Sequence, residues 1–526
     1  MALCTSNVTS GFIDLATYDE LEKYMYGGAD ATAYFVRETR KSTWFTQVPV
    51  CLSKSSGEAQ FGQEWSAQIT RSGDYLLNMW LQAEFPFVVN KTGNSGDNLR
   101  WVQNLMHNLV EECTITFNDL VAARFDSVHL DFWSQFAYPS DKQPLYNAMI
   151  GNADYQNVGK EFAVSAQSFG MNVGADNNRS LPGNVTISGS DATNLANFEH
   201  PLLQLPLPFF FSRDSGLALP TASLPYNEMR VNFKFRDWNQ LLLVDPSGAI
   251  GDSQTRHTTT ADFQVANGSS LTTMEPRLTN VNVWANYAIV SNDERKRMAC
   301  APRDMLIEQV QSAPIDLVRL NDSSPTFNLR FSHAIKLLFF GLRNASSGAA
   351  DNGPVDLSYY TSVQPSLLAG GGGTSNYMPM YVQDGSTSGS NNMLAGQNDP
   401  VDRVSLIYEN QHRLQEVSSN YCSLVQANNH AVCASANSPG YHMYSYSLDF
   451  ISLDPLASTN YGKLTNVSLQ LYLSRLAEAL QTASSTSVEI GSGATTSKNQ
   501  TYEFVCSVVN NNVVRISGGA LGFPIL

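Results

Sequence analysis

Alternation of apolar and polar residues at a period of two is the dominant pattern along this chain. Between residues 228 and 236 the alternation is strict, because Met229, Val231, Phe233 and Phe235 are separated by charged or amide side chains. Successive side chains of a β-strand point to opposite faces, so this stretch is predicted to be a strand with one face over a core.

The segment just before it, residues 205–227, is predicted to contribute another strand and a turn. Phe209, Phe210 and Phe211 form an apolar run that is too short for a core helix, and we interpret it as a buried strand. Ser212 is then expected to cap a short turn that extends through Ser215.

A similar unit recurs later in the chain. Alternation returns at residues 444–448 and again at residues 467–473, with a proline-containing turn between them. Ser212 and Ser452 are 240 positions apart, and Tyr226 and Tyr461 are 235 apart, so the two units keep nearly the same register. A repeat at this distance indicates one β domain that is built twice.

Period-two alternation predicts further strands in both halves, and helical spacing predicts short helices at a few places. Ser291 and Glu294 have the spacing of a helix capping box, as do Thr17 and Glu20. The predicted strands are 43–50, 65–70, 75–85, 109–118, 281–289, 305–311, 327–331, 334–342, 404–408, 421–426, 442–448, 501–509 and 513–516, and the predicted helices are 18–26, 127–137 and 294–298.

These elements predict an all-β protein of four segments. Residues 1–30 form an N-terminal arm with a short helix, 31–292 a first β domain, 293–303 a short connecting helix, and 304–526 a second β domain. Two stretches rich in small polar residues, 151–197 and 346–400, are predicted to be long surface loops. The apolar end, 521–526, is expected to dock on the protein.

Charge limits the classes of partner. Charged residues make up 15% of the 526 residues, below the roughly 25% of an average soluble protein, and the formal net charge is −15. The longest basic run is Arg295, Lys296 and Arg297. Affinity for nucleic acid comes mainly from lysine and arginine, so direct nucleic acid binding is not expected. The acidic balance also disfavours broad contact with anionic lipid.

Cysteine usage and the N-terminus bear on the compartment. The seven cysteines are odd in number and widely scattered, which favours reduced thiols and folding in a cytosol-like compartment. The first ten residues lack the basic and apolar regions of a secretory signal. The longest apolar run, residues 334–342, contains Lys336 and is far shorter than a membrane helix.

The sequence gives no catalytic, cofactor or metal motif. Cys422, His430 and Cys433 are the nearest approach to a metal cluster, but they lack the paired short spacings of structural zinc sites. A glycosidase needs two carboxylates, and Asp14, Glu111, Glu112 and Glu308 are candidates for such a pair. Glu111 and Glu112 are adjacent and therefore point to opposite faces of their strand. A carbohydrate-binding or glycan-cleaving β-sandwich remains an open alternative at this point.

Several long stretches resemble the major capsid proteins of iridoviruses, which belong to the large nucleocytoplasmic DNA viruses. The similarity runs from residue 10 to the last residue. The matching stretches are SGFIDLATYDELEKYMYGGADATAYFV at 10–36, RSGDYLL at 71–77, MHNLVEECTITFND at 106–119, LPLPFFFSRDSGLALPTASLPYNEMR at 205–230, RDMLIEQVQ at 303–311, LIYENQHRL at 406–414 and the terminal GFPIL.

The resemblance implies a double jelly roll, with two eight-stranded antiparallel β-sandwiches in tandem. It also implies a structural protein, with no enzyme activity, that forms homotrimers. Their six jelly rolls would make a pseudo-hexagonal capsomer in an icosahedral shell over an internal membrane. The implied partners are further copies, neighbouring capsomers and minor capsid proteins, with the membrane contacted weakly or indirectly. The implied location is the virion capsid, after synthesis and assembly in the host cytoplasm.

Two sets of residues are predicted to matter most, and the loops at 151–200 and 346–400 are expected to be longer than in the family's shorter members. The structural signature comprises Phe209, Phe210, Phe211, Ser212, Arg213, Asp214, Gly216, Pro220, Tyr226 and Asn227. The predicted contacts of the N-terminal arm are Phe12, Ile13, Leu15, Tyr18, Leu21 and Met25, through which the arm either packs on its own domain or reaches a neighbour or an inner layer.

Overall fold

The structure is a computed structural model, and it separates into two compact units, Met1–Trp44 and Phe45–Leu526. We refer to them as the arm and the body. The residues it describes are 8–26, 31–32, 34–35, 39, 41–86, 88–90, 98–102, 104–151, 202–245, 256–257, 259–260, 263–267, 270–300, 302–320, 322–345, 357–358, 360, 399–432, 440–481, 488–490, 494–496 and 501–523. Most of the two predicted long loops, and the end of the predicted C-terminal dock, therefore lie outside the described residues.

The arm contains two short helices, α1 (Val8–Ala16) and α2 (Glu20–Tyr26), and neither has a buried residue. The predicted helix starts at Tyr18, but the capping box uses other residues. Asp19 Oδ1 accepts from the backbone N–H of Glu20, and the Asp19 N–H donates to Glu22. Thr17 instead donates its hydroxyl to Asp14 O at 2.6 Å, at the end of α1, so the helix begins two residues later than predicted.

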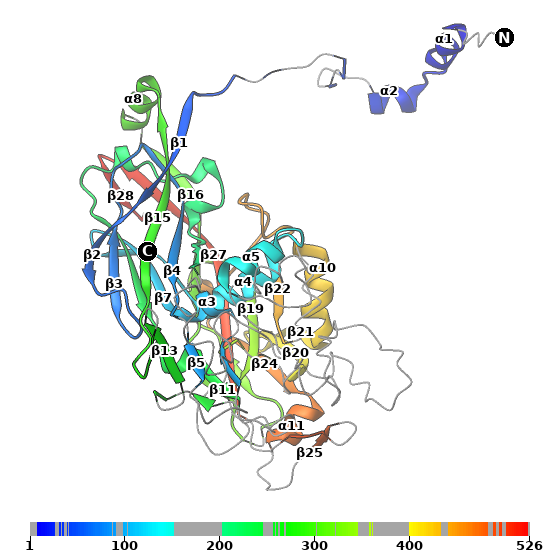
Figure 1. Cartoon of the computed structure of the whole chain (residues 1–526). Helices are drawn as coiled ribbons and strands as arrows, with labels where there is room; N and C mark the ends of the chain where they lie inside the picture. Colours follow the sequence, from blue (N-terminus) through cyan, green and yellow to red (C-terminus); the bar gives the residue numbers. More distant parts are fainter. Residues whose placement is uncertain are drawn as a thin grey trace, which may run out of the picture. The chain divides into compact units, whose positions relative to one another are not determined.

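The first sandwich of the body pairs two antiparallel sheets (Figure 1). Inward side chains of both sheets meet in one apolar core, and the strands predicted for this half are confirmed except the one at residues 209–211. Sheet 1A has the order β1 (Phe45–Cys51), β15 (Thr279–Val290), β4 (Tyr75–Glu84), β9 (Leu202–Pro206), and sheet 1B has the order β2 (Ser53–Gly57), β3 (Glu64–Gln68), β10 (Met229–Phe235), β7 (Val110–Phe117), β8 (Leu120–Asp126).

The stretch before β10 differs from its prediction. Phe209, Phe210 and Phe211 are buried in the first core as expected, but residues 210–212 form a 3₁₀ turn, η2 (Phe210–Ser212), and not a strand. Pro206 and Pro208 lack the N–H that a paired strand needs, which explains why β9 ends at Pro206. The capping residue is Asp214 rather than Ser212, since its carboxylate accepts from Gly216 N in η3 (Ser215–Leu217).

The second sandwich repeats the arrangement of the first. Its apolar core lies between two further antiparallel sheets. Sheet 2A has the order β16 (Arg303–Ser312), β27 (Tyr502–Ser517), β19 (Ala334–Asn344), β22 (His442–Ser445), with β17 (Asp316–Leu317), β23 (Thr459–Asn460) and β28 (Ala520–Gly522) paired at its margins, and sheet 2B has the order β18 (Thr326–Asn328), β24 (Val467–Leu473), β20 (Val401–Tyr408), β21 (Gln411–Ser418).

Short elements connect and extend the two sandwiches. The predicted connecting helix is present as α8, and no helix in the described part of the chain is both long and apolar enough to cross a bilayer. These elements are α3 (Leu105–Leu109), α4 (Ser127–Phe136), α5 (Gln143–Ile150), η4 (Thr221–Ser223), α7 (Trp238–Leu241), α8 (Asn292–Cys300), η7 (Tyr461–Lys463), α11 (Arg475–Gln481), β5 (Val88–Asn90), β6 (Asn98–Trp101), β11 (Leu242–Asp245), β12 (Arg256–His257), β13 (Phe263–Asn267), β14 (Ser270–Thr272), β25 (Val488–Ile490) and β26 (Ala494–Thr496).

One predicted strand of the second half is a helix. Residues 419–430 are helical throughout and include the π-helical turn η6 (Tyr421–Val425) and α10 (Gln426–His430). We call this segment the 419–430 helix. Cys422 is buried in the second core, while Ser423 donates its hydroxyl to Ser419 O one turn earlier. Tertiary packing therefore overrides the β propensity of its tyrosine and valine residues.

A hairpin followed directly by a helix occurs once in each half of the chain, which shows that the fold is duplicated. The two-residue turns Asn118–Asp119 and Glu409–Asn410 all have positive φ, which is the geometry of a type I′ hairpin. In the first half, β8 leads into α4; in the second half, β21 leads into the 419–430 helix. The offset between the halves is 291 residues here (119 to 410). Further along the chain the offset falls towards the 240 residues predicted from Ser212 and Ser452. The reason is that the connection after the helix is longer in the first half, residues 137–201, than in the second, residues 431–441.

The strand β27 belongs to both sandwiches. Residues 501–509 and 513–516 were predicted as separate strands, yet β27 runs through the intervening asparagines. Gln311 Nε2 of β16 donates to Asn510 Oδ1, and Asn512 Nδ2 donates to Gln309 Oε1 of β16, each at 2.9 Å. Side chains early in β27 enter the second core, whereas Val514 and Ile516, with Leu521 of β28, enter the first core. The domain limits 31–292 and 304–526 stay a prediction.

Candidate functional site

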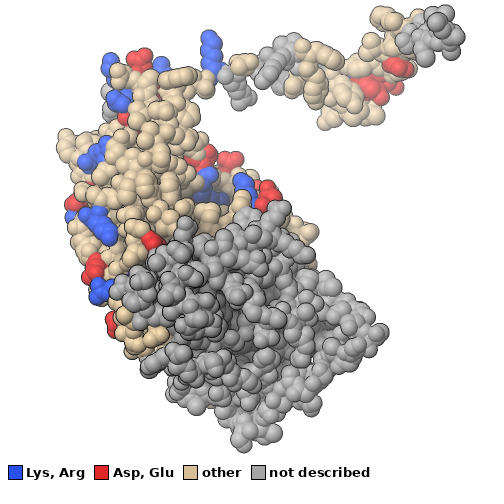
Figure 2. All heavy atoms as spheres, viewed as in Figure 1, with Lys and Arg blue, Asp and Glu red and all other residues tan. Residues whose placement is uncertain are grey.

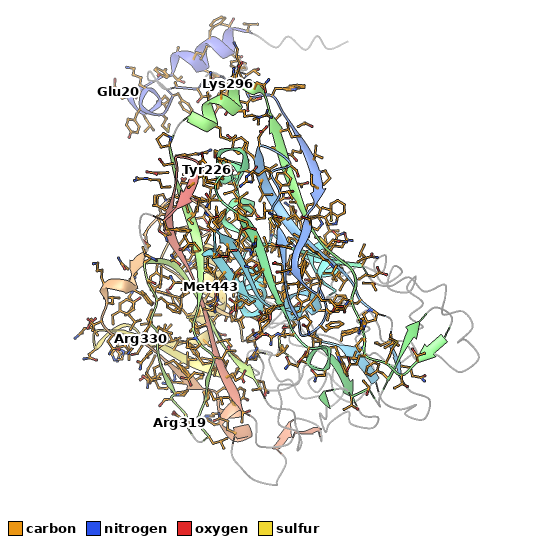
Figure 3. All side chains as sticks on the ribbon, turned by 90° about the vertical axis from the view of Figure 1, so that its left-hand side faces the viewer. Glu20, Tyr226, Lys296, Arg319, Arg330 and Met443 are labelled. Carbon is orange, nitrogen blue, oxygen red and sulfur yellow. The ribbon has the colours of Figure 1, made fainter. Side chains whose placement is uncertain are left out.

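The two sandwiches are joined through a third apolar cluster, which we call the junction. It lies where α4 of the first sandwich packs on the outer face of sheet 2A. Phe132 and Phe136 both stack on Phe339 of β19 with ring centroids 5.6 Å apart. Phe132 also meets Tyr441 edge-on at 5.0 Å. Figure 3 shows Met443, another member of this cluster, among the side chains packed in the middle of the body.

Local sequence explains the position of α4. The carboxylate of Asp126, the last residue of β8, accepts from His129 N at 2.8 Å and so caps the helix. Leu130 then faces the first core, and His129 Nδ1 lies 2.9 Å from Ser507 Oγ of β27. One helix therefore contacts both sandwiches.

A buried ionic cluster lies beside the junction. Glu308 of β16 forms ion pairs with Arg213, from the turn after η2, and with Lys336 of β19. Arg213 also donates to Ile451 O at 2.7 Å, and its guanidinium lies 4.9 Å from the ring centroid of Trp133. Burial lowers the pKa of Arg213 to about 10, against the opposing effect of Asp449, so the guanidinium is charged at neutral pH. Arg213 therefore links the two sandwiches electrostatically.

Lys336 completes this cluster. Burial, together with the nearby Arg213 cation, lowers the pKa of Lys336 to about 8, while its contact with Glu308 favours the charged ammonium. Its Nζ also donates to Ser452 O. The cluster thus holds the loop at residues 451–452 against β16 and β19.

A second buried polar cluster stabilises the helices next to the junction. Asp131 of α4 accepts from Asn104 and from Ser358, and its Oδ1 is 2.7 Å from His107 Nδ1. The other ring nitrogen of His107 is 2.7 Å from Tyr146 OH. A serine, a histidine and an aspartate are present, but the serine hydroxyl contacts the carboxylate and not the imidazole. All are buried, so the cluster has the geometry of a structural network.

The structure distributes the predicted signature residues between the first core and its margins. The three phenylalanines are in the core, Arg213 is at the junction, and Pro220 precedes η4. Asn227 is buried and accepts from Leu521 N at 3.1 Å, which ties the segment to β28. Tyr226 is exposed and would touch any Cβ added at Gly519 (Figure 3). Gly216 O accepts from Arg303 at 2.9 Å.

The six predicted arm residues share one property, since each has an exposed side chain and none belongs to an apolar core. They are Phe12, Ile13, Leu15, Tyr18, Leu21 and Met25. Their predicted contacts stay a prediction.

The candidate carboxylates of the body are engaged by cations. Glu111 is 3.0 Å from Lys234, Glu112 is 3.3 Å from Arg124, and Glu308 has the two partners described above. Within the residues the structure describes, no group of histidine, cysteine, aspartate and glutamate side chains could hold a metal ion. Cys422 is buried, His430 lies near Leu448 O, and Cys433 is outside the described residues.

Charge on the visible face is sparse. Figure 2 shows lysine, arginine, aspartate and glutamate scattered singly or in small mixed groups among neutral residues of the described part. This distribution agrees with the 15% of charged residues in the sequence.

Comparison with known proteins decides the family. Residues 33–290 match a profile described as the major capsid protein N-terminus, and residues 294–522 match one described as the large eukaryotic DNA virus major capsid protein. The major capsid protein of Costelytra zealandica iridescent virus is 49% identical over the whole of both chains. The chain belongs to the major capsid protein family of large eukaryotic DNA viruses. This membership displaces the alternative of a carbohydrate-binding or glycan-cleaving sandwich.

Further capsid proteins extend the comparison. The major capsid protein of Frog virus 3 is 40% identical, with 99% of each chain covered. A subunit of the PBCV-1 virus capsid has the same fold, with a TM-score of 0.64 at 17% identity, covering 94% of this chain and all of the other. The Faustovirus major capsid protein gives 0.57 at 10% identity, covering 97% of this chain and 99% of the other. The predicted double jelly roll is confirmed.

The resemblance places Arg213 in the predicted structural signature, but sequence reasoning identifies neither its role at the junction nor its partners. In the sequence, Glu308 is a candidate glycosidase carboxylate, and Lys336 is the charge that interrupts an apolar run. A lysine inside an apolar strand was the visible signal, because such a residue needs a buried partner. The roles of Trp133, His107 and Asp131 had no comparable signal, since their partners are far away in the sequence.

Proposed function

We propose that the protein forms a homotrimer whose six jelly rolls make one pseudo-hexagonal capsomer of an icosahedral virion shell. The observation that carries the proposal is the junction, which fixes in one body two sandwiches whose strand orders correspond, apart from the additional edge strand β2 of the first. Each chain then supplies two of the six similar jelly rolls of the capsomer. Contacts between unlike surfaces can repeat around a closed ring and across a shell.

Neighbouring capsomers and minor capsid proteins are the further partners in this proposal. The apolar residues of α1 and α2 are the surface for a minor capsid protein or an inner layer, because a helix with no buried face needs an external partner. The internal membrane is contacted weakly or indirectly, and nucleic acid is not bound, in keeping with the net charge of −15. The role is structural and without catalysis, with synthesis and assembly in the host cytoplasm.

Light scattering on the purified full-length protein tests the trimer. A mass of three chains supports the proposal, and a stable monomer at high protein concentration contradicts it. Electron microscopy of particles assembled with the other virion components then tests the shell.

Deletion of residues 1–28 tests the arm. The truncated protein should keep its trimer and fail to assemble shells, because no residue of α1 or α2 is part of a core. Leu21→Asp together with Met25→Asp should have the same effect, whereas Glu20→Gln, on the same helix, should assemble normally. Loss of the folded trimer on truncation would count against this role.

A further inference from the structure

The junction between the sandwiches uses two contacts whose counterparts in the duplicated fold are exposed. In the first contact, α4 covers the outer face of sheet 2A. In the second, β8 lies beside β16, and Gln309 Nε2 of β16 donates to Ala122 O of β8 at 2.8 Å. In both contacts an element of the first sandwich, α4 or β8, packs against sheet 2A of the second sandwich.

The 419–430 helix is the counterpart of α4, and its equivalent face is uncovered. Ser127 and Ser419 both start their helices directly after the hairpin, so Leu130 corresponds to Cys422; each faces its own core. By the same offset Trp133 corresponds to Val425. Trp133 packs against Phe450 across the junction, whereas the Val425 side chain is 46% exposed.

Two further junction residues of α4 show the same contrast, whereas Leu424, the counterpart of Phe132, is half-buried. Val128 and Phe136 are buried in the junction, while their counterparts Asn420 and Asn428 are exposed. This face of the 419–430 helix is therefore open and more polar than that of α4. Such a composition suits a contact between chains that fold separately before they meet.

The outer face of sheet 1A is the counterpart of the covered face of sheet 2A. In sheet 2A, the outward row Ser507, Phe339 and Met443 is completely buried at the junction, where α4 and Ala427 of the 419–430 helix lie in the same cluster. In sheet 1A, a cross-strand row joins Cys51, Trp284, Trp80 and Pro206. Its two indoles stack at 6.4 Å and are half-buried, and Cys51 is exposed.

The edge strands repeat this relationship. β8 and β16 lie together inside the chain, but their counterparts β21 and β1 are largely exposed along their lengths. Phe45 and Val48 of β1 are apolar side chains among those exposed. The second sandwich thus exposes the counterparts of α4 and β8, which are the 419–430 helix and β21. The first sandwich exposes the counterparts of the surface they would cover, which are the outer face of sheet 1A and β1.

We propose that a second copy of this chain fills this gap, so that its sheet 1A and β1 pack on the 419–430 helix and β21 of the first copy. The contact repeats between chains the arrangement that α4 and sheet 2A make within one chain. It joins unlike surfaces, so each copy offers both halves, and successive copies close into a ring. This inference rests on the proposed trimer and names the surfaces that form it.

Disulfide trapping tests the contact with the full-length protein. Asn286→Cys lies on the outer face of β15, and Val425→Cys lies on the open face of the 419–430 helix; both are introduced in a Cys51→Ser background. The double variant should give covalently linked trimers on mild oxidation or with a short bis-maleimide reagent, as seen in a non-reducing gel. Each single variant is the matched control and should give no linked trimer, because the contact pairs two different residues.

Light scattering on the same samples separates the two levels of the argument. Linked trimer from the double variant alone supports the contact. A sample that is trimeric in solution but remains unlinked with both reagents overturns this contact and leaves the trimer standing. A monomeric sample overturns both the contact and the proposed function.

Discussion

Arg213 of the first jelly roll and Glu308 of the second form a buried ion pair across the junction. Removing one partner of a buried pair leaves the other charge without full compensation. Arg213→Met should therefore lower the free energy of unfolding by about 3 kcal/mol, measured by urea denaturation.

The matched control is Arg515, whose guanidinium makes a two-point contact with exposed Asp304, at 2.7 and 2.8 Å. Solvent screens that pair, so Arg515→Met should leave the unfolding midpoint within error. Equal effects of the two variants would contradict a special role for Arg213.

Phe132 is the central aromatic residue of the junction. It is completely buried and contacts the rings of Phe339, Tyr360 and Tyr441. Phe132→Ala should lower the free energy of unfolding by about 3–5 kcal/mol, because the truncation leaves a cavity. Leu145→Ala, at an exposed position of α5, should change it by no more than about 0.5 kcal/mol. A small effect at Phe132 would show that the junction is not tightly packed.

Gly440 is required by both its backbone and its surroundings. Its φ is +96°, and a Cβ at this position would lie 1.9 Å from Tyr360 O. Gly440→Ala should destabilise the protein by at least about 2 kcal/mol, read from thermal unfolding. Gly522→Ala is the control, because nothing lies within 4 Å of the added Cβ and stability should stay the same or rise slightly.

His129 makes the junction sensitive to acid. Burial, with Arg213 nearby, lowers the pKa of His129 from 6.5 to about 3. In the window between these values the unfolded chain binds a proton that the folded chain does not, so this contribution to stability is complete above pH 6.5 and is lost as the pH falls.

Replacement of His129 by glutamine removes this titration. The wild type should lose about 2 kcal/mol through this histidine at about pH 5 relative to neutral pH, and His129→Gln should lose correspondingly less. Urea titrations at both pH values measure the difference. Parallel pH dependences of the two proteins would show that His129 does not titrate as described.

Period-two alternation located most strands of both jelly rolls, because each strand has one face in a core and one outside it. The pattern around Met229 is the clearest case, and β10 has the predicted bounds within one residue. The same reasoning failed at residues 421–426, whose composition favours a strand. Cys422 faces the second core from a helix, and local propensity carries no information about that contact.

The junction could not be predicted for a related reason. Arg213, Glu308 and Lys336 are distant in sequence, and their pairing depends on how one sandwich is placed on the other. The resemblance to capsid proteins predicted the tandem arrangement, but not which side chains hold it. Among the three, the lysine in a buried strand gave the one local clue.

The path of β27 has a consequence for the order in which the chain matures. Val514 and Ile516 complete the core of the first jelly roll, although they are translated after most of the second. The first half of a nascent chain therefore leaves the ribosome with part of its apolar core uncovered. Until residues 513–521 arrive, that half presents apolar surface that a chaperone can bind, so biogenesis of this subunit proceeds as one event rather than two.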